Sequence, residues 1–164
     1  MINSVSVVIK RMVEYFEGDV KRINHALKVY ALVKSIGELE GIPAEKMKAL
    51  EIAAVLHDIG IKESEKKYSS SSGKYQELEG PPIARDILQE LSLNQSLIDR
   101  VCYLIGNHHT YPKIDDIDFQ ILVEADFIVN IFEDDMTMEQ IKTVREKYFK
   151  TSTGLGYLGS MYNW

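Results

Sequence analysis

The sequence has little cysteine and no long apolar run. Its single cysteine excludes an internal disulfide. Because Cys102 lies in the apolar stretch LIDRVCYLIG, we expect a buried small hydrophobe and not a nucleophile there. No apolar run approaches the ~20 residues that a membrane helix needs. The first residues do not look like a signal peptide, since their charges follow the short apolar stretch. The chain is therefore expected to be cytoplasmic, with no membrane partner.

Positive charge is scarce as well. The chain carries 19 Lys and Arg against 25 Asp and Glu, which gives a formal net charge of -6, and its sequence pI is about 5.3. Nonspecific binding to nucleic acid depends on neutralising phosphates with Lys and Arg. We therefore expect no nucleic-acid polymer as a partner. No glycine-rich phosphate loop is present either, so no motif of that kind identifies a ligand.

What the sequence does have is helical periodicity over almost all of its 164 residues. Apolar residues recur every three or four positions, and no segment alternates convincingly with period two. The pattern predicts a single all-α domain over residues 1–164, with a core at about 20–150 and about six to seven helices. The helices are expected at about 6–16, 20–40, 44–58, 83–92, 95–109, 118–133 and 138–150.

Particular residues mark the expected helix ends. Asp19 and Asn94 are typical N-cap residues, and Thr137 with Gln140 fits a capping box. Residues 59–75, which contain SSSSGK, are expected to be a mobile loop, with a lid as one role for it. The helix after this loop is expected to start at Gly80-Pro81-Pro82.

The tail, 151–164, is expected to be irregular and partly docked, because it contains three glycines. Its aromatic residues would pack either on the core of the same chain or on a partner chain. A homodimer is therefore one prediction for the oligomeric state. The aromatic residues concerned are Tyr157, Tyr162 and Trp164.

All four histidines continue apolar stripes of the predicted helices. Side chains three or four positions apart lie on one helix face, and His25 shares such a face with Val29. His57 continues the stripe of Ala53, and His108 and His109 follow those of Leu104 and Ile105. The histidines therefore point toward or beside a buried interior.

Two aspartates lie on apolar stripes as well. Asp126 falls between Leu122 and Val129, and Asp58 stands beside Leu56. A buried carboxylate costs several kcal/mol unless it is paired or bound to a cation. Each residue alone has an ordinary explanation, since a buried histidine is usually hydrogen-bonded in the core and Asp126 could pair with Arg or Lys. Together they favour a shared divalent ion.

Three segments resemble the motifs of the HD-domain superfamily of metal-dependent phosphohydrolases: HALKVYALV from His25, HDIG from His57, and EADFIVN around Asp126. The resemblance covers about residues 20–150 and implies an all-helical, HD-domain-like fold. It also implies that the four metal-binding positions of the family are occupied here by His25, His57, Asp58 and Asp126.

The resemblance extends to two further segments. IGNHHTYP is similar to the segment where many members place additional histidines, which implies that His108 and His109 lie near the substrate or a second ion. QELEGPPIARDIL is similar to a segment that often begins with histidine, but here that position is Gln76. An amide is a poor substitute for an imidazole ligand, so the sequence favours one divalent ion over two.

The resemblance implies hydrolysis of a nucleotide or another small phosphate ester by a metal-activated water. Asp58 would orient the water, and His109 or His108 would stabilise the phosphoryl group or protonate the leaving oxygen. A mixed shell of imidazoles and carboxylates suits Mn, Fe, Co, Ni or Zn. The predicted substrate-binding residues, of which the three cations could equally be solvated surface charges, are Lys62, Gln76, Arg22 and Lys74.

Two other functions are open from the sequence. Gln76 could leave a metal-stabilised module that senses a nucleotide with little or no turnover. A few members of the superfamily use two irons to activate oxygen, and the missing histidine at Gln76 argues against that chemistry.

Overall fold

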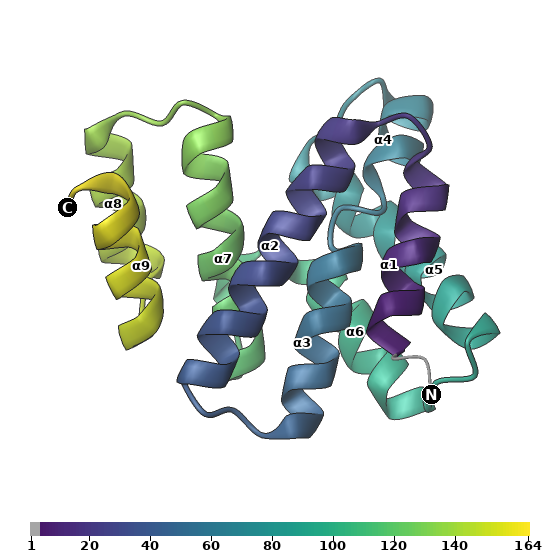
Figure 1. Cartoon of the computed structure of the whole chain (residues 1–164). Coiled ribbons are helices and arrows are strands. Elements are labelled where there is room, and N and C mark those ends of the chain that lie inside the picture. The colour runs from purple at the N-terminus through teal and green to yellow at the C-terminus, as the bar shows by residue number, and fades with distance from the viewer. Residues whose placement is uncertain (1–3) are drawn as a thin grey trace.

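The computed structural model describes residues 4–164, and every regular element in that part of the chain is a helix (Figure 1). The elements are α1 (Ser4–Phe16), α2 (Val20–Leu39), α3 (Ala44–Leu56), α4 (Ile61–Tyr68), α5 (Gly73–Glu90), α6 (Gln95–Asn107), the 3-10 helix η1 (Tyr111–Lys113), α7 (Ile117–Glu133), α8 (Met138–Tyr148) and α9 (Ser152–Tyr162). The prediction of an all-α fold is confirmed. Two helices, α4 and α9, were not predicted from the sequence.

Helices α2 and α3 lie in the middle of the molecule, with α1, α4, α5 and α6 on one side and α7, α8 and α9 on the other (Figure 1). Helix α2 packs against α3 and α7, and α3 also packs against α6 and α1. Helix α7 is buried along most of its length. The start of α2 therefore faces the end of α7, and this arrangement positions the candidate site.

The helix caps follow the sequence. The side chain of Asp19 accepts a hydrogen bond from Arg22 N, and that of Asn94 accepts one from Leu97 N. Thr137 and Gln140 exchange both bonds of a capping box. These interactions are local, which is why the residue types alone predicted them.

The loop predicted over 59–75 is wrong for most of its length, because α4 occupies residues 61–68 and α5 begins at Gly73. Helix α4 has Glu63 in its first turn and Lys66 and Lys67 in its last turn, where their charges complement the helix dipole. Only a short serine segment, 69–72, connects the two helices. Ser64 Oγ donates to Ser70 O at 2.8 Å, which fixes this segment to α4.

The predicted helix start at Gly80-Pro81-Pro82 is also wrong, since both prolines lie inside α5. Proline has no N–H group, so the carbonyls of Glu77 and Leu78 lack their usual helical partners. The helix continues through this point because α5 packs closely on α6 and α4. Tertiary packing thus outweighs a local signal that normally marks a helix end.

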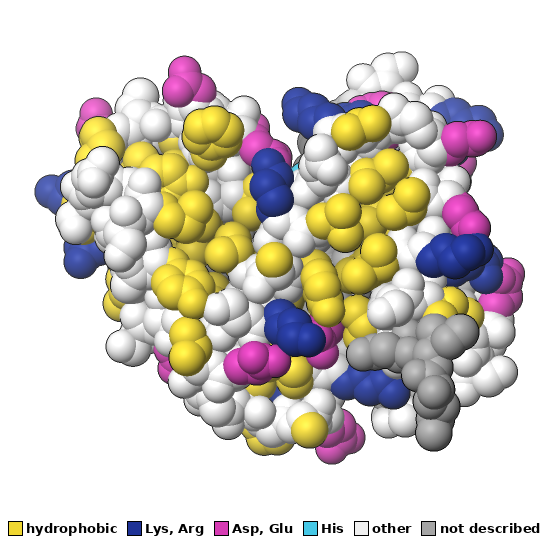
Figure 2. Space-filling view, in the orientation of Figure 1, with side chains coloured by type: hydrophobic (Ala, Val, Ile, Leu, Met, Phe, Trp, Pro, Cys, Tyr) yellow, Lys and Arg dark blue, Asp and Glu magenta, His cyan; other side chains and the backbone are white. Residues whose placement is uncertain are grey.

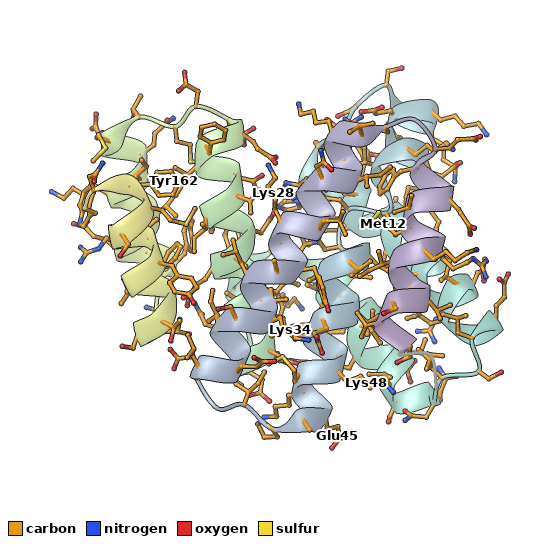
Figure 3. All side chains as sticks on the ribbon, viewed as in Figure 1. Met12, Lys28, Lys34, Glu45, Lys48 and Tyr162 are labelled. Atoms are coloured by element: carbon orange, nitrogen blue, oxygen red, sulfur yellow. The ribbon has the colours of Figure 1, made fainter. Side chains whose placement is uncertain are left out.

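The tail is helical, which corrects the prediction of an irregular segment. Thr151 caps α9 by accepting a hydrogen bond from Gly154 N, and Leu158 is fully buried. The hydroxyl of Tyr157 hydrogen-bonds Ser35 Oγ at 2.6 Å, and that of Tyr162 donates to Ile128 O at 2.6 Å. The tail therefore docks on the core of its own chain, with Tyr162 facing α7 (Figure 3). The homodimer stays a prediction.

A buried carboxylate joins α7 to the start of α9. Glu124 is fully buried, and it accepts hydrogen bonds from Gln120 Nε2, Lys150 N, Thr151 N and Thr151 Oγ1 at 2.5–3.1 Å. A side chain at Gly154 would bring a Cβ to 1.9 Å from Glu124 Oε1. Glycine is thus required where α9 approaches this carboxylate.

None of the helices in residues 4–164 combines the length and the hydropathy that crossing a membrane would take.

We expect Glu124→Ala to lower the free energy of unfolding by about 3 kcal/mol, because it leaves several buried donors without an acceptor. Chemical denaturation measures the change. The control is Glu146→Ala, which removes an exposed acid whose neighbour is Lys142 and should cost less than about 0.5 kcal/mol. Equal effects of the two substitutions would contradict the structural role of Glu124.

Candidate metal centre and cleft

Three helices bring four side chains together at one buried point. His25 comes from α2, His57 and Asp58 follow the last residue of α3, and Asp126 lies in α7. His25 Nε2 lies 3.1 Å from His57 Nε2 and 3.1 Å from Asp126 Oδ1. Asp58 Oδ2 lies 3.3 Å from His25 Nε2 and 3.4 Å from His57 Nε2. We call these residues the four-ligand cluster.

The turn after α3 aims His57 and Asp58 at this point. His57 keeps helical dihedrals, and the chain then tightens, with Ile59 N donating to Leu56 O and Ile61 N donating to Asp58 O. A Cβ on Gly60 would lie 2.6 Å from both Gln76 O and Gly80 N. The absence of a side chain at Gly60 therefore allows the backbone of α5 to pack against the turn after α3. This close packing brings Gln76 to the edge of the site.

The hydrogen bonds of the two imidazoles fix which nitrogen carries the proton. His57 Nδ1 donates to Ala54 O at 2.7 Å, and His25 Nδ1 donates to Glu133 Oε2 at 2.8 Å. In a neutral ring the other nitrogen, Nε2, then bears a lone pair. The two Nε2 lone pairs face each other at 3.1 Å. Such a pair is repulsive unless a proton or a cation lies between them.

The spacing of the four ligand atoms fits a metal ion. Ligand atoms about 2.1 Å from one ion are separated by roughly 3.0–3.4 Å in octahedral and tetrahedral geometries. The measured separations among the cluster atoms are 3.1–3.4 Å. His25, His57 and Asp126 also form a group whose ligand atoms lie within 4.8 Å of one another. These residues therefore suit a divalent transition metal.

The pKa values show what the site holds when no metal is bound. Burial disfavours the charged form of His57, but the carboxylates of Asp58 and Asp126 outweigh this cost and raise its pKa to about 10. The pKa of Asp126 is held well below its ordinary value; burial opposes this shift, and the charge of His57 outweighs it. The metal-free site thus holds carboxylates around a protonated His57.

A second cluster adjoins the first and shares Asp58 with it. Asp58 Oδ1 lies 3.4 Å from His108 Nε2, while Asp58 Oδ2 faces the first cluster. His108 Nδ1 donates to Ile105 O at 2.7 Å, so Nε2 bears the lone pair. Among residues 4–164, His108 Nε2 is the one buried side-chain nitrogen or oxygen without a hydrogen-bond partner. Asp58, His108 and His109 are the members of this second cluster.

Gln76 orients His109. Its Nε2 donates to Ser71 O at 2.5 Å, so its Oε1 is the atom that faces His109 Nε2 at 3.2 Å. His109 Nε2 must then carry the proton, which leaves the lone pair on Nδ1. Burial, together with the nearby His108, lowers the pKa of His109 to about 4. The ring is neutral at pH 7, which suits a metal ligand better than a general acid.

A cleft of about 270 Å³ opens onto the four-ligand cluster. Arg22 lines it and bonds Asp19 and Glu65, and its role in binding substrate stays a prediction. Lys62 and Lys74 lie outside its lining: Lys62 Nζ donates to Tyr15 O, and Lys74 Nζ lies over the ring of Tyr75. The lining residues are Lys21, Arg22, His25, Asp58, Ile61, Ser71, Gln76, His109, Asp126, Asn130, Glu133 and Asp134.

Glu133 is a residue of the site that the sequence pattern did not predict. Its Oε2 accepts the hydrogen bond from His25 Nδ1, and its Oε1 lies 2.5 Å from Lys28 Nζ. Figure 3 shows Lys28 between α2 and α7. Its position in the sequence could have indicated that it lies near the site, since Glu133 lies two helical turns after Asp126 on the same face of α7.

Comparisons with known proteins agree with this geometry. The family model of the HD domain matches residues 22–146. A solved structure with a similar fold is described as a predicted HD superfamily hydrolase from an uncultured Thermotogales bacterium. The TM-score is 0.70 at 21% sequence identity, over 96% of this chain and 84% of that chain, so the likeness concerns the fold. No curated protein matches the sequence.

Removing Glu133 should weaken metal binding without unfolding the protein. Loss of a hydrogen-bond partner behind a ligating histidine typically costs 10–100-fold in metal affinity. We expect about a tenfold or greater loss for Glu133→Ala and a smaller one for Glu133→Gln, whose amide oxygen still accepts from His25. Titration calorimetry with Ni²⁺ measures the affinity.

The matched control for Glu133 is Glu51→Ala. Glu51 also joins a neighbouring helix to α2, through Tyr30 and Lys34, but it contacts no ligand. Its substitution should leave the Ni²⁺ affinity within about twofold. If both variants lose affinity equally, Glu133 acts only as a tether between helices.

Metal binding should release protons. Since the pKa of metal-free His57 is about 10, its imidazole is protonated at pH 7 and must lose that proton to bind an ion. We expect at least one proton to be released per ion and Ni²⁺ affinity to rise about tenfold per pH unit between pH 6 and 8. Calorimetry in buffers of different ionisation enthalpy counts the protons, and a pH-independent affinity would disprove the protonated cluster.

Proposed function

The chain belongs to the HD-domain family, and on that premise we propose that it is a metal-dependent phosphohydrolase acting on a nucleotide or another small phosphate ester. The observation that carries the proposal is the four-ligand cluster, with two imidazole lone pairs and two carboxylates converging at 3.1–3.4 Å. The cluster lies at the inner end of an open cleft. A substrate can therefore reach the atoms that would hold the metal.

The chemistry divides between the ion and the chain. When bound, a divalent ion polarises a phosphoryl oxygen and lowers the pKa of water. The chain holds the attacking water and the phosphoryl group next to each other. In the reaction the oxygen of water bonds to phosphorus as the ester bond breaks, and the proton that the water gives up replaces phosphorus on the leaving oxygen, which departs as an alcohol.

Named side chains have distinct tasks in this proposal. The carboxylates of Asp58 and Asp126 accept hydrogen bonds from water and fix its orientation. Arg22 stands in the cleft wall as a charge of the right sign for the phosphoryl group. Neutral His109 donates from Nε2 to Gln76 Oε1, so Gln76 serves to position His109 at this edge of the cleft.

The second cluster supports a second, weaker ion. Asp58 presents one carboxylate oxygen to each cluster, and the lone pair of buried His108 has no partner in residues 4–164. Fewer ligands and the glutamine at position 76 favour weaker binding there. We therefore infer one tightly held ion, with a second at higher metal concentration.

The decisive experiment is turnover by protein that has been stripped of metal and reloaded with Mn²⁺, Co²⁺, Ni²⁺ or Zn²⁺. The substrates are p-nitrophenyl phosphate, bis-p-nitrophenyl phosphate and nucleoside phosphates. We expect His57→Ala to lower kcat/KM by more than about a hundredfold, because it removes a metal ligand. Lys46→Ala, an exposed substitution at the opposite end of α3, should leave it unchanged.

The same experiment separates the sensing module from the enzyme. Stabilisation by a nucleotide without product release over hours would favour binding alone, and turnover that persists unchanged in His57→Ala would refute the metal-dependent mechanism.

A further inference from the structure

Polar side chains continue outward from the metal ligands along both walls of the cleft. On α2, Lys21 lies four residues before His25, and on α7, Asn130 lies four residues after Asp126, a spacing that places each pair on one helix face. Asp134 caps the end of α7, and all three outer residues line the cleft. The start of α2 and the end of α7 stand apart on the two sides of the cleft (Figure 1), so these residues face the same space.

These three outer side chains are free to bind a ligand. The other charged residues of the outer cleft are already paired, Arg22 with Asp19 and Glu65, and Glu133 with Lys28 and His25. By contrast, the side chains of Lys21, Asn130 and Asp134 form no hydrogen bond or ion pair with another side chain of residues 4–164.

The cleft lining contains few apolar side chains. Ile61 is the one apolar side chain in its lining, and no Phe, Tyr or Trp of the described chain contributes to it. Binding of a base or an aryl ring normally relies on apolar and aromatic contacts. Figure 2 shows acidic and basic side chains on both sides of the hollow between the start of α2 and the end of α7.

The size and the charges of the cleft further restrict the class of ligand that it can bind. A volume of about 270 Å³ is slightly below the roughly 300–1,000 Å³ that ligand sites usually span. Lys21 and Asp134 carry opposite charges, so the free groups of the outer cleft supply no excess positive charge for a second phosphate group. Asn130 and Asp134 instead offer an amide and a carboxylate, which hydrogen-bond well to hydroxyl groups.

We propose that the outer cleft selects monophosphate esters of a small polyhydroxylated alcohol, such as a sugar, with Asn130 and Asp134 binding its hydroxyl groups. The proposal rests on the phosphohydrolase function proposed above. Lys21 contributes long-range attraction for the substrate anion. A nucleoside monophosphate is accepted only through its sugar, with its base outside the cleft.

The test compares ribose 5-phosphate with p-nitrophenyl phosphate, whose leaving group has no sugar hydroxyls. In Asn130→Ala and Asp134→Ala we expect KM for ribose 5-phosphate to rise about tenfold, the effect of losing one good hydrogen bond, while kcat changes less than twofold. KM for p-nitrophenyl phosphate should stay within twofold. The control is Asp135→Asn, which removes the adjacent charge outside the lining and retains a residue type that tolerates the positive φ of 49° at this position.

Nucleoside monophosphates test the position of the base. We expect AMP and CMP to give KM values within about threefold of that for ribose 5-phosphate. A KM for AMP more than tenfold lower, or equal losses for both substrates in the Asn130 and Asp134 variants, would overturn the proposal. If the metal-loaded protein hydrolyses neither p-nitrophenyl phosphate nor ribose 5-phosphate nor the nucleoside monophosphates, the phosphohydrolase function fails. In that case, calorimetry measures the binding of ribose 5-phosphate to Ni²⁺-loaded wild type and to Ni²⁺-loaded Asn130→Ala. About tenfold weaker binding to the variant would support recognition of the sugar by the cleft. Equal binding to both proteins, or no binding to either, would overturn it.

Discussion

The rest of the structure depends on one interaction in the interior, the repulsion between the Nε2 lone pairs of His25 and His57. The Nδ1 atom of His25 hydrogen-bonds Glu133, and the Nδ1 atom of His57 hydrogen-bonds Ala54 O. Because these bonds fix both rings, neither Nε2 atom can turn away from the other. Two carboxylates close the same space. Such an arrangement is unfavourable without a positive charge at its centre, so the fold is built around a cation or the protons that replace it.

The surrounding helices serve this arrangement. The ligands come from α2, from the end of α3 and from α7, and these three helices pack on one another at the centre of the molecule. Close backbone contact at Gly60 brings α5 and its Gln76 to the edge of the site. Glu124 ties α7 to the cap of α9. The helix that carries Asp126 is thus held on both sides.

In the proposed function, recognition and chemistry occupy different depths of one cleft. The inner part contains imidazoles and carboxylates whose lone pairs converge, while the outer part contains side chains with unused hydrogen-bonding capacity. The outer part is built from the start of α2 and the end of α7, while the inner part also takes His57 and Asp58 from the turn after α3. Under the proposed function, a change in the outer part would alter substrate choice without disturbing the residues proposed to hold the metal.

Local and periodic signals made much of the molecule predictable. The caps at Asp19, Asn94 and Thr137 depend on neighbouring residues only, and the apolar stripes indicated that His25, His57 and Asp126 point inward. The resemblance to a known family then grouped them. Helices α4 and α9 escaped prediction because serine, glycine and charged residues give a weak local signal, and contacts with distant helices stabilise both segments.

The sequence by itself therefore determined the helical class, the caps at Asp19, Asn94 and Thr137 and the inward direction of His25, His57, His108 and Asp126, because these follow from periodicity and short-range hydrogen bonding. Only the tertiary structure decided that Glu133 supports His25, that Asp58 is shared by two clusters, and that Lys62 and Lys74 lie outside the cleft. Those facts depend on the angles at which helices pack, and the pattern along one helix carries no information about the side chain that faces it from another.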